Sequence, residues 1–172
     1  MISEIQRLIE LYARKGVLVD TNILLLYYVG AVNRHRIEKF KRTEQFKAED
    51  YTLLVSFLQS FEKVVATPNI LTEVSSCINQ LLDSERYPER SRCYSLFAED
   101  IQKTLYESYV PSSDVAVQDW SFYAYGLTDC GIASVARNSY LVLTDDLKFA
   151  AYLQSQGIDA LNFNNIRPLG WT

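Results

Sequence analysis

A short buried strand that ends on a carboxylate is the feature that most constrains this chain. Val17-Leu18-Val19 follows Gly16, and this run of apolar, mostly β-branched residues predicts a short buried strand. The strand stops at Asp20, and the side-chain oxygens of Thr21 and Asn22 could cap a helix that follows. We therefore expect Asp20 at the carboxyl end of a central strand. In open α/β sheets this is the edge where ligands bind.

The same alternation of strands and helices continues along the chain. Further strands are predicted at 63–67, 109–110, 140–144 and 158–163. Helical patterns cover 1–16, 23–29, 33–47, 51–61, a stretch that begins at Pro68, 85–109 as one helix or a broken pair, 114–125 and 147–156. Gly126 is predicted to end one helix and Thr128 to cap the next. Strands separated by helices predict a parallel sheet, hence an α/β fold: a three-layer α/β/α sandwich with a central parallel sheet of four to five strands.

Size and composition fit one domain. The chain has 172 residues, 48% of them hydrophobic, and no long linker or repeat, so we expect a single domain over 1–172. Within it we expect an N-terminal helix at 1–15 and a helical insertion at 31–62. The three cysteines lack metal-ligand spacing, and the first helix lacks a signal-peptide or membrane-spanning run. These features predict reduced thiols in a cytoplasmic protein.

Acidic residues recur where the predicted strands and helices meet. Asp20 and the pair Asp145-Asp146 follow strands, Asp129 begins a helix, and Glu73 lies early in the helix after the second strand. All should face the carboxyl edge of one sheet. Carboxylates held close together repel one another unless a cation lies between them.

A hard divalent cation with oxygen ligands is the simplest such cation, so the expected cofactor is Mg²⁺ or Mn²⁺. Such an ion activates water and neutralises the charge that builds on a phosphodiester during in-line attack. His35 is the single histidine, which argues against zinc.

Four segments in this order resemble the motifs of the PIN-domain nucleases, among them the VapC-type toxin ribonucleases of toxin–antitoxin pairs. They are Val-Asp-Thr-Asn at 19–22, Ala-Thr-Pro-Asn-Ile-Leu-Thr-Glu at 66–73, Leu-Thr-Asp-Cys-Gly-Ile-Ala at 127–133 and Leu-Thr-Asp-Asp-Leu-Lys-Phe at 143–149. The segment before the first strand and the stretch between Gly30 and Lys63 are both larger than we expect for the compact toxins.

The resemblance implies a metal-dependent endoribonuclease that hydrolyses RNA phosphodiester bonds, with an antitoxin protein and a homodimer as further expectations. Its catalytic residues would be Asp20, Glu73, Asp129 and Asp146. The metal ligands would be Asp20, Asp129 and Asp146. Asn22 and Thr144 would support the first and last acids, and Asp145 is either a further ligand or a helix cap.

Several alternatives remain open at this point. The basic stretch 33–47 is either a solvated helix face or a grip on the phosphate backbone, and Arg34, Arg36 and Lys39 are its candidate contacts. A catalytically inactive PIN-like module for RNA binding or assembly would keep the fold without turnover. A phosphatase of the haloacid-dehalogenase type would need a second acid two residues after Asp20, where this chain has Asn22.

Overall fold

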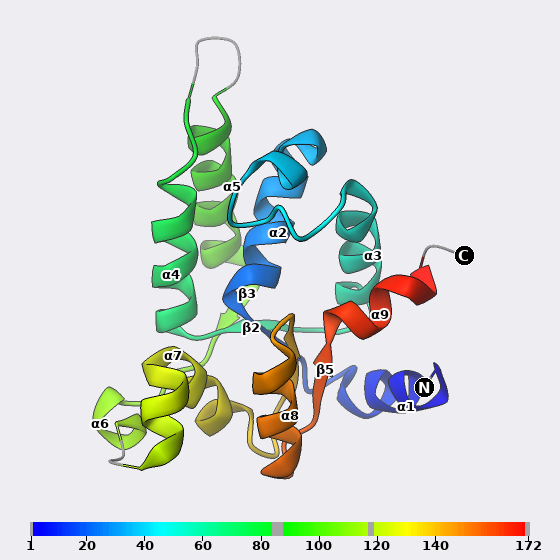
Figure 1. Ribbon diagram of the computed structural model, residues 1–172, viewed down its shortest axis with the longest axis vertical. Helices are drawn as coiled ribbons and strands as arrows, with labels where there is room; N and C mark the ends of the chain where they lie inside the picture. The colour runs from blue at the N-terminus through cyan, green and yellow to red at the C-terminus, as the bar shows by residue number, and fades with distance from the viewer. Residues whose placement is uncertain (1, 84–87, 117–118, 171–172) are drawn as a thin grey trace.

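The protein is built around one parallel β-sheet. Its structure, a computed structural model, describes residues 2–83, 88–116 and 119–170 (Figure 1). The sheet has five strands in the order β3-β2-β1-β4-β5, and every pairing is parallel. The strands are β1 (Val17–Val19), β2 (Val64–Ala66), β3 (Leu105–Glu107), β4 (Leu141–Thr144) and β5 (Ala160–Asn162). Helices flank this sheet, which confirms the predicted α/β class with a three-layer α/β/α sandwich.

The central strand β1 is buried along its whole length. Leu18 is paired with Val65 of β2 on one side and with Val142 of β4 on the other. All three β1 residues are inaccessible to solvent. A continuous apolar run is expected where helices cover both faces of a parallel sheet. Gly16, with φ of 116°, precedes the strand, and a Cβ there would lie 2.9 Å from the carbonyl oxygen of Lys63.

Helices account for most of the remaining chain. Their bounds are α1 (Ile2–Tyr12), α2 (Thr21–Val32), the 3₁₀ helix η1 (Arg34–Lys39), α3 (Ala48–Leu58), α4 (Pro68–Ile78), α5 (Glu89–Lys103), α6 (Ser112–Val115), α7 (Trp120–Ala136), α8 (Leu147–Ser155) and α9 (Phe163–Gly170). Figure 1 shows α2 among α3, α4 and α5, all of which it contacts. Helix α7 contacts α8 and β4 at the other end of the molecule.

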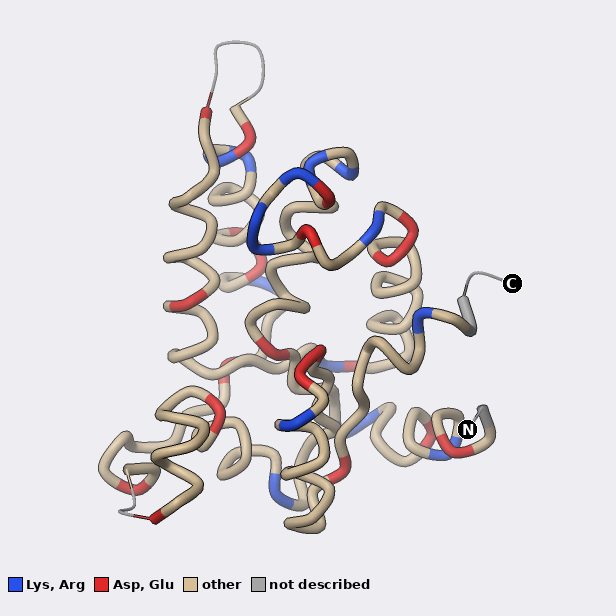
Figure 2. Tube along the Cα trace, in the orientation of Figure 1, with Lys and Arg blue, Asp and Glu red and all other residues tan. Residues whose placement is uncertain are grey.

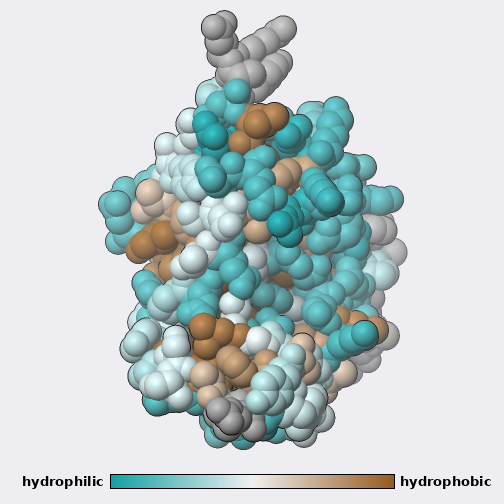
Figure 3. Space-filling view, turned by 60° about the vertical axis from the view of Figure 1, so that its left-hand side comes forward, coloured by the Kyte–Doolittle hydropathy of each residue, from teal (hydrophilic) through white to brown (hydrophobic). Residues whose placement is uncertain are grey.

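The core joins distant parts of the chain. Its buried residues extend from Leu8 in α1 to Ile166 in α9. The surface seen in Figure 3 is mostly hydrophilic, with small hydrophobic patches, one of them low in the view where α6 and α7 lie. In the described ranges, no helix is both long and apolar enough to cross a membrane. Cys77, Cys93 and Cys130 are free thiols.

The third strand lies earlier in the chain than its predicted position at 109–110. Leu105-Tyr106-Glu107 forms β3, in register with Val64 to Ala66 of β2. Tyr106 and Glu107 are exposed on this edge strand, so its hydrophobic pattern is weak. Tyr109 is 72% exposed and lies outside the sheet. The helix or broken pair predicted over 85–109 is α5, which ends at Lys103 before β3, so the last part of this prediction is wrong; residues 85–87 lie outside the described residues.

The basic stretch 33–47 is less helical than predicted. Only η1 is helical, and turns follow it. Thr43 fixes these turns because its buried hydroxyl donates to the carbonyl oxygen of Ile37 over 2.7 Å. Ile37, Phe40 and Phe46 are buried, so the predicted packing side of this stretch is confirmed although its helix is not.

Gly126 ends the first helical segment of α7, as predicted, and a second segment follows it to Ala136. The φ of 75° and ψ of −170° at Gly126 are not helical values. The predicted helix 114–125 is divided between the short α6 and the first part of α7, and residues 117–118 between them lie outside the described residues. The sequence located the break correctly because glycine adopts positive φ without the steric cost of a Cβ.

Candidate active site

An acidic cavity opens where the order of the strands reverses. From β1 the chain moves to β2 and β3 on one side of the sheet, and then to β4 and β5 on the other. Ligands bind in open α/β sheets at such a switch point, outside the carboxyl ends of the strands. A cavity of about 390 Å³ is lined by residues that follow β1 and β4 and by residues of α2, α4 and α7. The acidic residues that line it are Asp20, Glu73, Asp129 and Asp146.

Asp20 is fixed at the end of β1. Its Oδ1 accepts a hydrogen bond from the backbone N–H of Thr21 over 2.7 Å, and its Oδ2 accepts one from Thr144 Oγ1 over 2.6 Å. Asp20 is itself the N-cap of α2, so the expectation that Thr21 and Asn22 cap this helix is wrong. The strand ends one residue earlier than such a cap requires, and the aspartate takes the capping position.

Glu73 is held by two threonine hydroxyls. Thr21 Oγ1 donates to Glu73 Oε2 over 2.9 Å, and Thr128 Oγ1 donates to Oε1. Helix α4 carries Glu73 and begins as predicted, with Thr67 as N-cap and Pro68 in the first turn. Thr21 and Thr128 thus fix the carboxylate of an exposed residue at the cavity wall, between α2 and α7.

Asp129 reaches the cavity from the part of α7 that follows the break at Gly126. Burial and, to a smaller extent, the negative charges of Asp20, Glu73 and Asp146 together raise the pKa of Asp129 to about 7. The helix that carries Asp129 packs against both α4 and α8, the elements that bring Glu73 and Asp146 to the cavity.

The two aspartates after β4 have different surroundings. Asp146 lines the cavity and is the N-cap of α8, because its Oδ1 accepts from the backbone N–H groups of Lys148 and Phe149 over 2.7 and 3.0 Å. Asp145 is not the cap of α8. Its Oδ1 accepts from Asn22 Nδ2 over 3.1 Å, and its carboxylate is absent from the cavity wall.

The two supporting residues have different partners. Asn22 supports Asp145 rather than Asp20, because its Nδ2 donates to Asp145 Oδ1. Thr144 contacts both the first and the last acid, because its hydroxyl donates to Asp20 and accepts from the backbone N–H of Asp146 over 3.1 Å.

The electrostatics of the cavity disfavour ionisation of its buried acids. The pKa of Asp20 is raised to about 6, chiefly by burial and also by the charges of Asp145 and Glu73. The hydrogen bonds from Thr144 and Thr21 lower this pKa and offset part of the rise. A cation in this cavity would relieve the repulsion and stabilise the ionised carboxylates.

The oxygen atoms of the four cavity acids are the ligands that Mg²⁺ and Mn²⁺ prefer. In the part of the chain that the structure describes, no group of three or more His, Cys, Asp or Glu side chains is arranged to hold a metal ion as it stands. His35 lies in η1, is exposed, and does not line the cavity.

The structure places the three basic candidates away from the cavity. Arg36 forms an ion pair with Glu89, with 3.1 Å between Nε and Oε2, and the guanidinium of Arg34 lies 5.0 Å from the centre of the Tyr51 ring. Lys39 is exposed and is not among the lining residues.

Arg42, from the same basic stretch, lines the acidic cavity instead, and its Nε donates to Gln80 Oε1 over 3.0 Å. Figure 2 shows several basic residues in the stretch 33–47, which the sequence identified from charge alone. The path of the turns after η1 decides which of these basic residues reaches the acidic cavity.

Searches of protein-family models, of curated proteins and of solved structures found nothing that matches this chain.

Proposed function

We propose that this protein is a divalent-metal-dependent endoribonuclease of the PIN-domain type, which hydrolyses RNA phosphodiester bonds. One observation carries the proposal: Asp20, Glu73, Asp129 and Asp146 come from separate segments of the chain and line one cavity at the switch point of the sheet. These are the residues that the four family-like motifs supply. A scaffold protein has no physical need to gather mutually repelling carboxylates in one place.

The donor atoms of this cavity suit Mg²⁺ or Mn²⁺. Asp20, Asp129 and Asp146 would hold the ion, directly or through water, since Mg²⁺ takes one or two carboxylates and keeps several waters. The raised pKa values of Asp20 and Asp129 support a cation at this place. Neither carboxyl forms an ion pair with a basic side chain that the structure describes, and both would ionise fully beside a cation. When bound, the ion would supply the positive charge that activates water and neutralises the charge building on the phosphodiester.

The residues of the chain have separate tasks in this proposal. Thr144 and the start of α2 hold Asp20 in one orientation, so that little reorganisation is needed when a substrate binds. Glu73, fixed by Thr21 and Thr128, positions the attacking water. Arg42 gives the acidic cavity a positive group that can contact a phosphate of the RNA backbone.

Cleavage of a labelled single-stranded RNA tests the proposal. The wild-type protein should cut the RNA with Mg²⁺ or Mn²⁺ and lose activity in EDTA. Asp20→Asn should reduce the rate by about 100-fold or more, the effect expected when a central charged group is removed from an active site. Asp114→Asn, which changes an exposed acid of α6 outside the cavity, is the matched control and should cut like the wild type.

Activity that persists in EDTA, or an Asp20→Asn variant as active as the wild type, would contradict the proposal. An RNA that binds tightly but stays intact with either metal would instead identify a catalytically inactive RNA-binding module. Two further substrates complete the assay. Cleavage of DNA of the same sequence would point to a different nuclease, and hydrolysis of a generic phosphomonoester would point to a phosphatase.

The biological setting belongs to the same proposal. We infer a cytoplasmic toxin whose partner is a small antitoxin protein, and a homodimer as its assembly. A neighbouring gene for a small DNA-binding protein that blocks cleavage when added would support the antitoxin. If no such gene is present and expression of the chain alone causes no growth arrest, the proposal is restricted to an RNase outside a toxin–antitoxin pair.

A further inference from the structure

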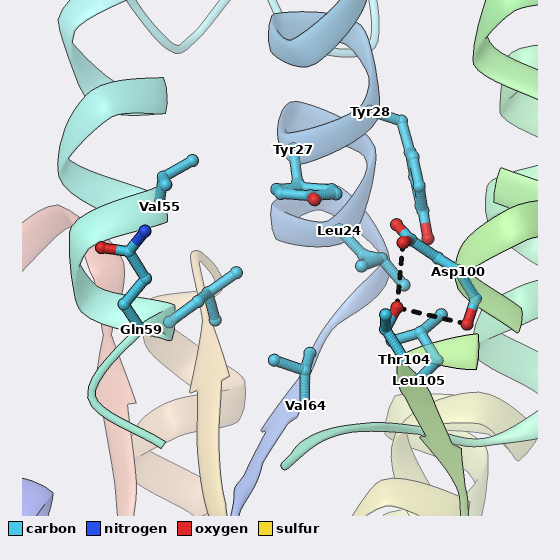
Figure 4. Close-up of a pocket in the computed structure, with 10 residues that line it drawn as sticks. Leu24, Tyr27, Tyr28, Val55, Gln59, Val64, Asp100, Thr104 and Leu105 are labelled. Atoms are coloured by element: carbon cyan, nitrogen blue, oxygen red, sulfur yellow. Dashed lines mark hydrogen bonds between the residues drawn. The ribbon is translucent and has the colours of Figure 1, made fainter. Parts of the chain in front are cut away.

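A second cavity, of about 270 Å³, lies between α2, α3 and α5 and shares no lining residue with the acidic cavity. Figure 4 looks into it. Leu24 and Tyr27 reach it from α2, Val55 and Gln59 from α3, and Asp100 from α5. We call it the tyrosine pocket. Nothing in the proposed nuclease uses it.

Two polar groups converge on one wall of the tyrosine pocket. Tyr28 is fully buried, and its hydroxyl oxygen is closed off from solvent. Figure 4 shows this hydroxyl beside the carboxylate of Asp100. Burial raises the pKa of Tyr28, and the charge of Asp100 raises it further, so the hydroxyl remains protonated at neutral pH. The hydroxyl interacts with this carboxylate, so a ligand in the pocket reaches Asp100 and not the buried oxygen of Tyr28.

Asp100 has hydrogen-bonding capacity to spare. Thr104 Oγ1 donates to Asp100 Oδ1 over 2.9 Å, and the Tyr28 hydroxyl lies beside the carboxylate (Figure 4). Among the described residues, Asp100 forms no ion pair with a Lys or Arg side chain. Lys103, one turn further along α5, is already paired with Glu99 over 2.8 Å. The pocket thus carries a negative group at one wall with no cation opposite it.

The remaining walls are largely apolar. Leu24, Leu58, Val64 and Leu105 line the pocket with Val55, and the Tyr27 ring adds an aromatic surface. Dry apolar cavities of about 150 Å³ accept benzene. A pocket of about 270 Å³ therefore has space for one ring and a short chain.

We propose that the tyrosine pocket binds a small primary amine with an aromatic body. The ammonium group donates to Asp100, and the body packs against Leu24, Val64 and the Tyr27 ring. Charge complementarity selects the ammonium, because the carboxylate would repel an acid of the same shape. The apolar walls select the body, because an inorganic cation would leave them in contact with water.

Isothermal titration calorimetry with 2-phenylethylamine at pH 7 tests this proposal. We expect saturable binding at one site per chain. Phenylacetate, an anion of similar shape, and 2-phenylethanol, a neutral analogue, should each bind at least about tenfold more weakly. Methyl chemical shifts of Leu24, Val64 and Leu105 should change during the titration, which places the ligand in the pocket.

Variants assign the two polar groups. Asp100→Asn keeps an oxygen that can accept from Thr104 but removes the charge, and it should weaken amine binding by about tenfold or more. Tyr28→Phe removes a hydroxyl that a ligand cannot reach, so it should change amine binding by a smaller factor than Asp100→Asn does. Asp114→Asn, the exposed control, should bind like the wild type.

Three results would overturn the proposal: no saturable binding of 2-phenylethylamine, equal binding of phenylacetate, or unchanged affinity in a folded Asp100→Asn variant. If Asp100→Asn does not fold, the comparison of the amine with phenylacetate decides the question. Asp20→Asn should bind the amine normally, so the outcome is independent of the nuclease assay.

Discussion

Thr144 donates a hydrogen bond of 2.6 Å to Asp20, and this contact joins the ends of β4 and β1 at the floor of the acidic cavity. Thr144→Val keeps the shape of the side chain but removes the donor. We expect it to lower the free energy of unfolding by about 1–3 kcal/mol, because a buried carboxylate oxygen loses its partner. Thr144→Ser should stay closer to the wild type. Urea denaturation of the three proteins measures the difference, and equal stability of the valine variant would show that the contact is weak in solution.

A buried ion pair should stabilise the packing of α3 against α9. Arg167 Nη2 lies 2.8 Å from Asp50 Oδ2, and Asp50 is fully buried. Asp50→Ala should destabilise the protein by about 3–5 kcal/mol, since the charge of Arg167 then loses this partner in a largely buried place. Glu99→Ala, which breaks the exposed pair with Lys103, is the control and should cost less than about 1 kcal/mol. Similar losses in thermal or urea unfolding for both variants would contradict this assignment.

The stability of the metal-free protein should depend on the ionisation of Asp129. Its folded-state pKa of about 7 is raised from the ordinary value of 3.8. The protonated Asp129 carboxyl therefore contributes fully to the stability of the folded protein below pH 4, and this contribution is lost as the pH rises toward 7. Asp129→Asn does not titrate. The free energy of unfolding of the variant relative to the wild type should therefore rise by roughly 2–4 kcal/mol from pH 4 to pH 8, since one pKa unit corresponds to about 1.4 kcal/mol.

Urea unfolding in EDTA at several pH values measures this change. A difference between the two proteins that stays constant across the range would mean that Asp129 titrates normally in the folded protein.

Thr128 should act on catalysis through Glu73 alone. Thr128→Val removes one of the two hydroxyls that hold the Glu73 carboxylate, and we expect the cleavage rate to fall about tenfold as its orientation is lost. In the Glu73→Gln background, the same change should add much less. A double-mutant cycle on the RNA cleavage rate tests this coupling. Strictly additive effects would separate Thr128 from Glu73.

The sheet could be predicted from the sequence where strands are buried on both faces. Val17 to Val19 and Leu141 to Thr144 are wholly buried, and their continuous apolar runs locate them. The edge strand β3 has no such run, because Tyr106 and Glu107 face solvent. Its pairing with β2 depends on backbone hydrogen bonds, which leave no side-chain pattern to read.

Within the candidate site, the acids were easier to predict than the groups around them. Asp20 and Asp146 follow strands directly, so strand positions alone bring them to one edge. Arg42 reaches the cavity through turns that Thr43 fixes by a contact with a distant carbonyl, and no periodic pattern encodes such a path. The hydroxyls of Thr21 and Thr128 likewise meet Glu73 only after α2, α4 and α7 have packed.

Titration of the metal-free protein with Mn²⁺ at pH 7.5, followed by electron paramagnetic resonance of the free ion, tests most directly whether the acidic cavity binds a divalent cation. We expect one or two ions per chain in the wild type and in Asp114→Asn, and an affinity lower by about tenfold or more in Asp20→Asn and in Asp129→Asn. Equal Mn²⁺ binding by all four proteins, or none in the wild type at millimolar Mn²⁺, would contradict a metal site formed by these carboxylates.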